Sequence, residues 1–190
     1  MDAREILDLY ERADSFAREV ANFRDDVAIP ANNELRYAGH HFMKAHAGAT
    51  VDNDQLDGAR RHCERAMYEA AEAGIQRAVR MMREFQTDYE DLVVSEVIPD
   101  FAARMVAADE AMDALARGRH GRSSVEDHAA EYMAIFRGLR ASCDIFSASR
   151  SDLNAIARGD RTDTRRFVIK VAVSLAAVCA SAAIAIAQYL

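Results

Sequence analysis

The chain has 190 residues, of which 51% are hydrophobic and 7% aromatic, and it contains two prolines, eight glycines and no tryptophan. A sandwich or barrel of many short strands needs more turn residues, so the composition excludes an all-β fold and favours long helices. The three cysteines are odd in number and lack zinc-site spacing, which excludes a disulfide framework and suits a reducing compartment. They are Cys63, Cys143 and Cys179.

Charge is distributed unevenly along the chain. The 24 basic and 31 acidic residues give a net charge of −7, whereas residues 1–157 alone hold 19 basic and 29 acidic residues, a net of −10. Nucleic-acid binding needs a basic face that replaces counterions, so we do not expect direct nucleic-acid binding. The basic residues that follow this acidic head form a collar, which consists of Arg158, Arg161, Arg165, Arg166 and Lys170.

The N-terminal third predicts two helices. Apolar residues recur over 6–27 at alternating steps of three and four, the pattern of a helix-bundle seam. The Ile29-Pro30 pair is expected to end this helix, because proline clashes with a continuing helix. Asn32 or Asn33 can cap a second helix that runs to about Ala47. The predicted inward residues are Ile6, Leu9, Ala13, Phe16, Val20, Phe23 and Val27, followed by Leu35, Ala38, Phe42 and Ala45.

Three further helices are predicted before the collar. The third covers about 54–94 and carries two apolar stripes, so we expect it to contact partners on two sides. Pro99 is placed to end it and to lie in the first turn of a fourth helix over about 100–117. After the loop 118–122, a capping box opens a fifth helix that ends at Gly159. Its predicted inward residues are Tyr132, Phe136, Leu139, Cys143, Phe146 and Leu153.

The composition of the last twenty residues predicts a membrane-spanning helix. Residues 171–190 contain no charge, proline or glycine, and a helix of that length covers about 30 Å, the thickness of a bilayer's hydrocarbon core. A buried core helix is the alternative. Basic residues beside a span stay on the cytoplasmic side. We therefore predict a tail anchor in the inner (cytoplasmic) membrane, with the head in the cytosol and the C-terminus across the bilayer.

The composition of the span favours self-association. Small residues recur every four positions, a spacing that lets helix backbones approach closely in lipid, so a homo-oligomer is expected. Ser174, Ser181 and Gln188 are the polar candidates for lining an aqueous pore. The predicted packing residues are Ala172, Ala176 and Ala180 on one line and Ala177, Ser181 and Ala185 on another.

Together these patterns predict an all-α chain. The expected fold is an antiparallel bundle of about five long helices plus one C-terminal transmembrane helix. Its parts are a cytosolic bundle over 1–159, a basic juxtamembrane linker over 160–170 and the tail anchor over 171–190.

Two arginine–histidine pairs are the candidates for catalysis: Arg36 with His41, and Arg122 with His128. An arginine and a histidine about one helical turn apart can hold a phosphate and move a proton during RNA cleavage. The spacing resembles the Arg-x4–6-His motif of HEPN domains, which are small helical bundles. The resemblance implies a metal-independent ribonuclease. A polar residue usually follows the arginine in that family, and the serine after the second arginine fits this pattern, whereas the tyrosine after the first does not.

The alternative for the first pair is a structural interpretation. In that interpretation Arg36 bonds to an acidic neighbour, Glu34 or Glu69, and His40 and His41 lie at a polar seam of the bundle. Other catalytic patterns are absent from the sequence: there is no Glu-x-x-His pair, no His-Glu-x-x-His, no Cys-x-x-Cys and no glycine-rich phosphate loop. We therefore expect neither a metal nor a cofactor, and whether the chain is an enzyme stays open.

A helical head on one membrane helix is similar to the small membrane-anchored effector and accessory proteins of bacterial immune systems of the CRISPR type. That resemblance implies a membrane-perturbing role in antiphage defence, with the bilayer, other copies of the chain and a defence-system protein or ribonucleoprotein as partners. The alternatives are a membrane-tethered HEPN-type ribonuclease and a non-catalytic anchor or scaffold for a partner protein.

Overall fold

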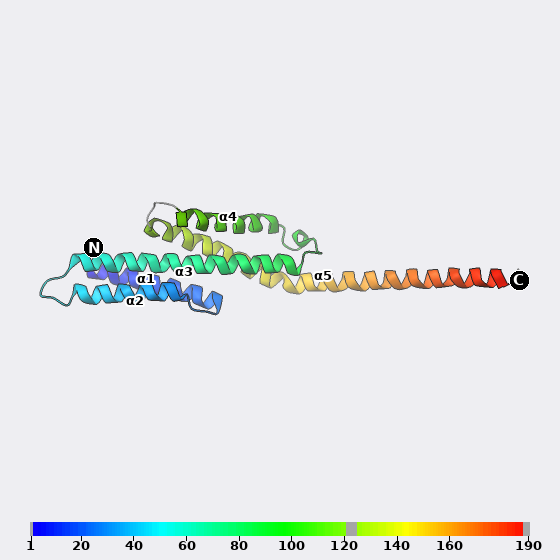
Figure 1. Cartoon of the computed structure of the whole chain (residues 1–190), viewed down its shortest axis with the longest axis horizontal. Helices are drawn as coiled ribbons and strands as arrows, with labels where there is room; N and C mark the ends of the chain where they lie inside the picture. The colour runs from blue at the N-terminus through cyan, green and yellow to red at the C-terminus, as the bar shows by residue number, and fades with distance from the viewer. Residues whose placement is uncertain (1, 121–124, 188–190) are drawn as a thin grey trace.

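The computed structural model describes the backbone of residues 2–120 and 125–187 and the side chains of 2–117 and 128–159. Within those residues the chain is helical and contains no strand, which confirms the predicted all-α class. Figure 1 shows the elements in chain order. They are α1 (Ala3–Arg24), α2 (Ile29–Ala45), α3 (Asn53–Asp88), the short 3-10 helix η1 (Val94–Glu96), α4 (Phe101–His120) and α5 (Val125–Ala187).

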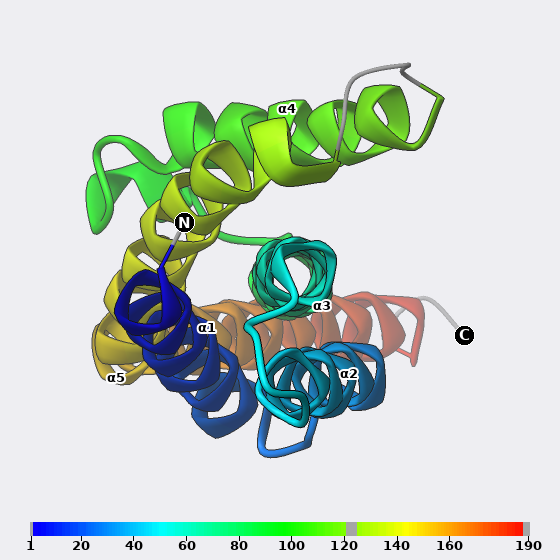
Figure 2. The same cartoon turned by 90° about the vertical axis from the view of Figure 1, so that its left-hand side faces the viewer.

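Helix α3 is the centre of the head. It packs against α1, α2, α4 and α5, so the prediction that it contacts partners on two sides is confirmed. Viewed along the molecule, α3 lies between α4 on one side and α2 on the other (Figure 2). Helix α4 therefore lies on the opposite side of the head from α2.

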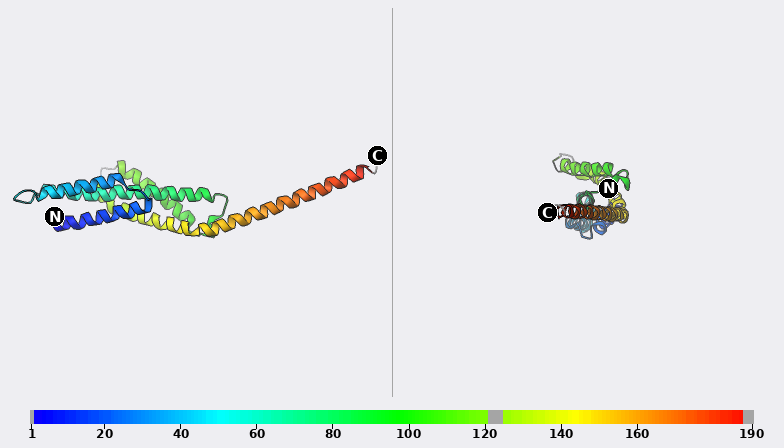
Figure 3. Two further views of the ribbon diagram at one scale, coloured as in Figure 1. Left: turned by 90° about the horizontal axis from the view of Figure 1, so that it is seen from below. Right: turned by 90° about the vertical axis from the view of Figure 1, so that its right-hand side faces the viewer.

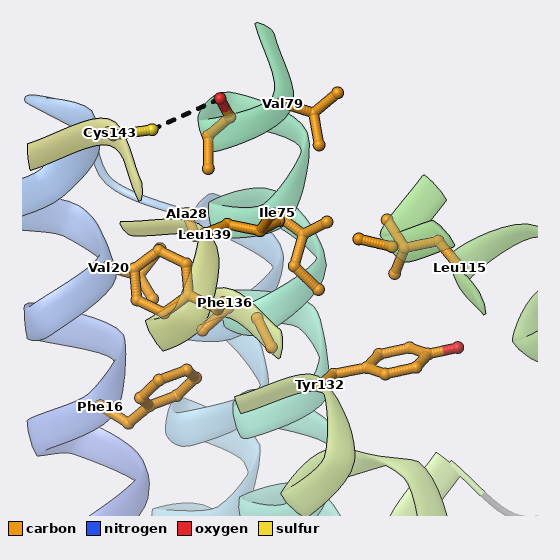
Figure 4. Packing of buried hydrophobic residues seen from close by; sticks show 14 of the residues in the cluster. Phe16, Val20, Ala28, Ile75, Val79, Leu115, Tyr132, Phe136, Leu139 and Cys143 are labelled. Carbon is orange, nitrogen blue, oxygen red and sulfur yellow. Dashed lines mark hydrogen bonds between the residues drawn. The ribbon is translucent and has the colours of Figure 1, made fainter. Parts of the chain in front are cut away.

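The core forms where the apolar stripes of α1, α3 and α5 meet (Figure 4). Phe136 of α5 is fully buried, and the rings of Phe16 and Phe23 meet it edge-on at centroid distances of 5.9 Å and 5.4 Å. Gly74 of α3 makes room for this ring, because a Cβ at that position would lie 2.6 Å from Cδ2 of Phe136. All six inward residues predicted for the fifth helix are buried.

The boundary between α1 and α2 differs from the prediction. Helix α1 ends at Arg24, where Asp25 adopts the left-handed conformation (φ 54°) and closes the last turn. Helix α2 then begins at Ile29 with Pro30 in its first turn and no side-chain cap, so neither asparagine caps it. Proline has no amide hydrogen to lose at a helix start, which is why it opens α2 here. Val27 consequently lies in the connection, 49% exposed, rather than in the core.

Helix α3 also ends earlier than predicted. Its last residue is Asp88, and Tyr89 and Val94 pack into the core from the segment that follows. The 3-10 turn η1 and Pro99 then carry the chain to α4, which begins at Phe101 next to the predicted start.

Helix α5 continues through Gly159, where the sequence predicted an end. It is a single helix of 63 residues, which corresponds to a length of about 95 Å. Its first half packs into the head and its C-terminal part extends away from it (Figures 1 and 3). A glycine weakens a helix interior by only about 1 kcal/mol, so a single one does not stop a helix. The predicted linker is therefore helical in its backbone.

Among the described residues, no helix is long and apolar enough to cross a membrane. The side chains of 160–190 lie outside the described residues. The tail anchor over 171–190 remains a prediction.

Candidate functional site

A polar cluster lies between α2 and α3 and contains one of the predicted histidines. The two helices form an antiparallel hairpin whose interface is lined by small buried residues, among them Ala38 and Ala59. Gly58 of α3 leaves space for the ring of His41, because a Cβ there would lie 2.9 Å from Nδ1 of that ring. The short side chains bring the polar groups of the two helices within hydrogen-bonding distance.

The shortest of these contacts joins Glu34 of α2 to His62 of α3. Oε2 of Glu34 lies 2.6 Å from Nδ1 of His62, and the two side chains are 17% and 24% exposed. An ionised carboxylate can only accept, so Nδ1 of His62 donates. In the neutral ring, Nε2 is then a proton acceptor.

His41 makes a similar contact about two turns further along α2. Its Nδ1 lies 2.7 Å from Oε1 of Gln55, an amide oxygen that accepts, so Nδ1 donates here as well. The ring of His41 stacks on that of His62 with centroids 5.1 Å apart and an interplanar angle of 22°. We call Glu34, His41, Gln55 and His62 the histidine cluster.

The histidine cluster presents two imidazoles side by side, each held through Nδ1. Within the described residues, neither Nε2 has a hydrogen-bond partner. Tyr37, which is half-exposed, lies beside the pair, its ring centroid 5.5 Å from that of His62. Two neighbouring proton acceptors can serve in acid–base chemistry.

Arg36 does not join this cluster. It is exposed on α2 and its Nη1 donates to Oδ1 of Asn33 at 3.3 Å, while Glu34 is engaged with His62. Five positions along a helix correspond to a rotation of about 140°, so Arg36 and His41 leave α2 in different directions. Within one chain, the structure does not bring the predicted pair together. The polar seam expected for His41 is present, and its partner there is Gln55.

The second predicted pair is only partly described. Arg122 lies outside the described residues. His128, near the start of α5, places Nδ1 3.4 Å from Oε2 of Glu131 and stacks on Tyr132 at a centroid distance of 5.7 Å. The hydroxyl of Tyr132 donates to the backbone oxygen of Ala114 at 2.8 Å, which ties α5 to α4.

Most of the collar and the predicted span fall outside the described side chains. Arg158 is described, and its Nε donates to the backbone oxygen of Asn154 one turn earlier, at 3.1 Å. The side chains of Arg161, Arg165, Arg166 and Lys170 lie outside the described part, as do all the predicted packing residues of 171–190.

The described cysteines are placed for packing rather than for catalysis. Cys63 and Cys143 are buried, and burial raises the pKa of their thiols to about 12 and about 11, respectively. A thiol that stays protonated at neutral pH is a poor nucleophile and metal ligand. Among the described side chains, no three histidine, cysteine or acidic groups converge as a metal site.

A groove of about 780 Å³ between α4 and α5 is lined by four alanines together with polar and charged side chains, and it contains a second polar network. Nη1 of Arg104 donates to Oγ of Ser142 at 3.0 Å, and that hydroxyl donates to the backbone oxygen of Gly138 at 3.2 Å. Nη2 of Arg104 donates to Asp100 at 2.6 Å. Nε of Arg104 is buried and has no hydrogen-bond partner among the described residues, whereas both Nη atoms are engaged, so this network ties α4 to α5.

Sequence reasoning missed His62, Glu34 and Gln55 as members of one site. The signal that could have found them is the pairing of 29–45 and 53–88 as a hairpin, which places the three side chains at the same interface as His41. Comparison with known proteins adds no relative to this description: no family model, no curated protein and no solved structure matches the chain.

Proposed function

We propose that the chain is a tail-anchored protein whose helical head is held at the cytoplasmic surface of a membrane and transmits its state to the span through α5. The observation that carries this proposal is the continuity of α5. One 63-residue helix begins in the head and extends through the collar into the uncharged C-terminal segment. Buried residues from Tyr132 to Leu153 fix its first half in the core.

The charge distribution supports the same arrangement. A head of net charge −10 is repelled by an anionic membrane surface, whereas each collar cation near such a surface contributes about 1 kcal/mol of attraction. The collar therefore favours a topology in which the acidic bundle lies on the cytoplasmic side of the membrane.

In this proposal the anchored chains self-associate and act as a membrane-perturbing effector or accessory protein in prokaryotic antiphage defence. Two features support it: the small-residue repeats of 171–190 and the resemblance of the architecture to membrane-anchored proteins of bacterial immune systems.

Membrane fractionation and membrane potential test the proposal together. The full chain expressed in bacteria should stay in the membrane after alkaline carbonate extraction and should depolarise the cells, and a chain lacking 167–190 should do neither. Ala176→Arg with Ala180→Arg should release the protein, because charges are costly at the bilayer centre. The matched control, Ala176→Leu with Ala180→Leu, should remain membrane-bound. Full extraction of the intact chain contradicts the anchor. Membrane retention without depolarisation contradicts the effector role and supports a scaffold.

The second candidate function is a membrane-tethered ribonuclease. The observation that favours it is the pair of open Nε2 atoms in the histidine cluster, because a pair of imidazoles can supply both a base and an acid. The candidate residues are His41 with His62, Arg36 as a phosphate contact from a second copy, and Arg122 with His128.

Full chain in detergent, incubated with RNA without metal, decides this candidate. Cleavage lost in His41→Ala or His128→Ala but kept in His40→Ala supports the enzyme, because His40 is exposed and lies outside the cluster. No cleavage by the intact chain, or cleavage unaffected by all three substitutions, contradicts it.

A further inference from the structure

The outward surface of α2 differs in charge from the rest of the head. Within residues 1–157, α2 is the helix in which basic residues outnumber acidic ones, and its one acidic residue, Glu34, is turned toward α3. Arg36 and Lys44 are exposed, and neither has an ion pair in the described part of the chain. We call this surface the cationic face. It consists of Ile29, Arg36, Tyr37, His40, Met43 and Lys44.

The cationic face is also unusually apolar for an exposed surface. Ile29, Tyr37 and Met43 are 67%, 53% and 66% exposed, although other large apolar residues of the head are mostly buried. The steps of seven, four and three or four between positions 29, 36, 40 and 43–44 place these side chains on one side of the helix. An exposed surface that combines apolar groups with unpaired cations fits an acidic partner that has apolar contacts of its own.

Helix α4 presents the complementary surface on the other side of the head. Val106 is 55% exposed, and the acidic residues around it point outward with it. Glu110 and Asp113 have no ion pair among the described side chains, and Asp109 is paired with Arg83 at 3.1 Å. We call this surface the acidic face. It consists of Ala102, Val106, Asp109, Glu110 and Asp113.

We infer that the cationic face of one copy packs against the acidic face of the next copy, with Arg36 and Lys44 opposite Glu110 and Asp113, and Met43 against Val106. The two helices that carry these faces, α2 and α4, lie on opposite sides of α3 (Figure 2). Two copies joined in this way still have one cationic face and one acidic face free. Further copies can therefore add to them, and the association continues as a row or closes into a ring. Heads of net charge −10 otherwise repel, and the cationic face offsets this repulsion.

The inference rests on the proposed function in one respect, which is that the copies share a membrane plane. Contact between two helices buries less than the roughly 800 Å² per partner of a standard stable interface. Anchoring raises the effective concentration of neighbouring heads, which makes such a small contact sufficient. Repetition by a sideways shift also keeps every α5 pointing in the same direction, as a common membrane requires.

Disulfide cross-linking in isolated membranes tests the contact. A full chain carrying Met43→Cys and Val106→Cys should form a ladder of dimers, trimers and higher species under a mild oxidant. Each single variant should form none, and two differently tagged single variants should cross-link only to each other. The native Cys63 and Cys143 are buried, so they do not contribute, and every variant in this test also carries Cys179→Ser.

Charge reversal makes the test specific. Arg36→Glu with Lys44→Glu should reduce the cross-linked fraction at least tenfold, and adding Glu110→Lys with Asp113→Lys to the same chain should restore it to within twofold. Recovery of the ladder also shows that the first variant is folded. The matched control, Arg65→Glu with Arg80→Glu, reverses two exposed cations on α3 and should leave the ladder unchanged.

Carbonate extraction of the same samples separates this inference from the proposed function. A carbonate-resistant chain without a ladder, or with a ladder that charge reversal does not change, overturns the contact and leaves the anchor standing. A ladder from a chain that carbonate releases supports the contact and contradicts the anchor. A chain that carbonate releases and that forms no ladder contradicts both the contact and the anchor.

Discussion

Oε2 of Glu34 and Nδ1 of His62 lie 2.6 Å apart across the interface of α2 and α3, although the two residues are 28 positions apart in the chain. Both side chains are more than three-quarters buried, so each replaces much of the other's lost hydration. The contact joins the two helices of the hairpin and holds His62 beside His41.

Replacement of His62 by alanine should therefore destabilise the head. The change leaves the largely buried Glu34 carboxylate without its histidine donor, which costs about 1–3 kcal/mol. Urea unfolding of the full chain in detergent, followed by helical circular dichroism, measures the loss. His40→Ala is the control and should change the unfolding free energy by less than about 0.5 kcal/mol, because His40 is exposed. Equal losses in the two variants would show that the Glu34 contact contributes nothing.

Two glycine-to-alanine changes should have opposite effects. In Gly74→Ala the new methyl group would lie 2.6 Å from Cδ2 of the buried Phe136 ring, which is too close. The unfolding free energy of this variant should therefore fall by about 1–3 kcal/mol. In Gly39→Ala the methyl group has no neighbour within 4 Å, so α2 should gain about 0.5–1 kcal/mol from the better helix former. The same unfolding assay compares them. A Gly74 variant as stable as the unmodified chain contradicts the packing of α3 on α5.

The cysteines of the head should resist alkylation at pH 8. The thiols of Cys63 and Cys143 have pKa values raised to about 12 and about 11 by burial, so they are protonated as well as shielded. Peptide mass spectrometry after iodoacetamide treatment should find both unmodified in the folded chain and both modified in urea. Rapid modification of either in the folded state would place it at the surface.

The same two thiols predict a loss of stability at alkaline pH. Their ordinary pKa is 9.0, so above that pH the unfolded chain releases these protons while the folded chain still holds them. The unfolding free energy should therefore fall as pH rises from 9 toward 11. Unfolding midpoints across this range, compared with those of Cys63→Ala and Cys143→Ala, measure the effect. A decline of the same slope in both alanine variants would assign it to other groups.

The core could be predicted from the sequence because helical periodicity determines which side of a helix is apolar. The stripes through Ile6, Leu9, Phe16 and Val20, and through Tyr132 and Phe136, are buried as predicted. Helix ends were less predictable. Pro30 is compatible with the end of one helix and with the start of the next, and only the left-handed Asp25 decides between them. Gly159 does not end α5, because one glycine costs a long helix little.

The histidine cluster could not be predicted from motifs. The spacing of Arg36 and His41 resembles a catalytic motif, but five positions along a helix separate the directions of the two side chains. The contacts of His41 with Gln55 and His62 depend instead on how α2 pairs with α3. That register follows from the fit of Gly58 and the buried alanines, which the sequence shows only once the hairpin is known.

Reversal of charge in the collar should weaken the anchor and leave the head folded. Each cation near an anionic surface contributes about 1 kcal/mol, and Arg165→Glu with Arg166→Glu replaces two attractions by two repulsions. Carbonate extraction should release a larger fraction of this variant, with the same circular dichroism as the unmodified chain. Asp160→Asn with Asp163→Asn is the control and should be retained at least as well. Unchanged retention of the arginine variant would show that the collar does not contribute to anchoring.

The central claim is that α5 carries the C-terminus across the membrane and leaves the head in the cytosol. Protease access to an epitope placed before Met1 tests it most directly. The account predicts that the epitope is protected in intact spheroplasts and digested in inverted membrane vesicles. Digestion in intact spheroplasts, with a cytosolic marker still protected, would place the head outside and contradict the account.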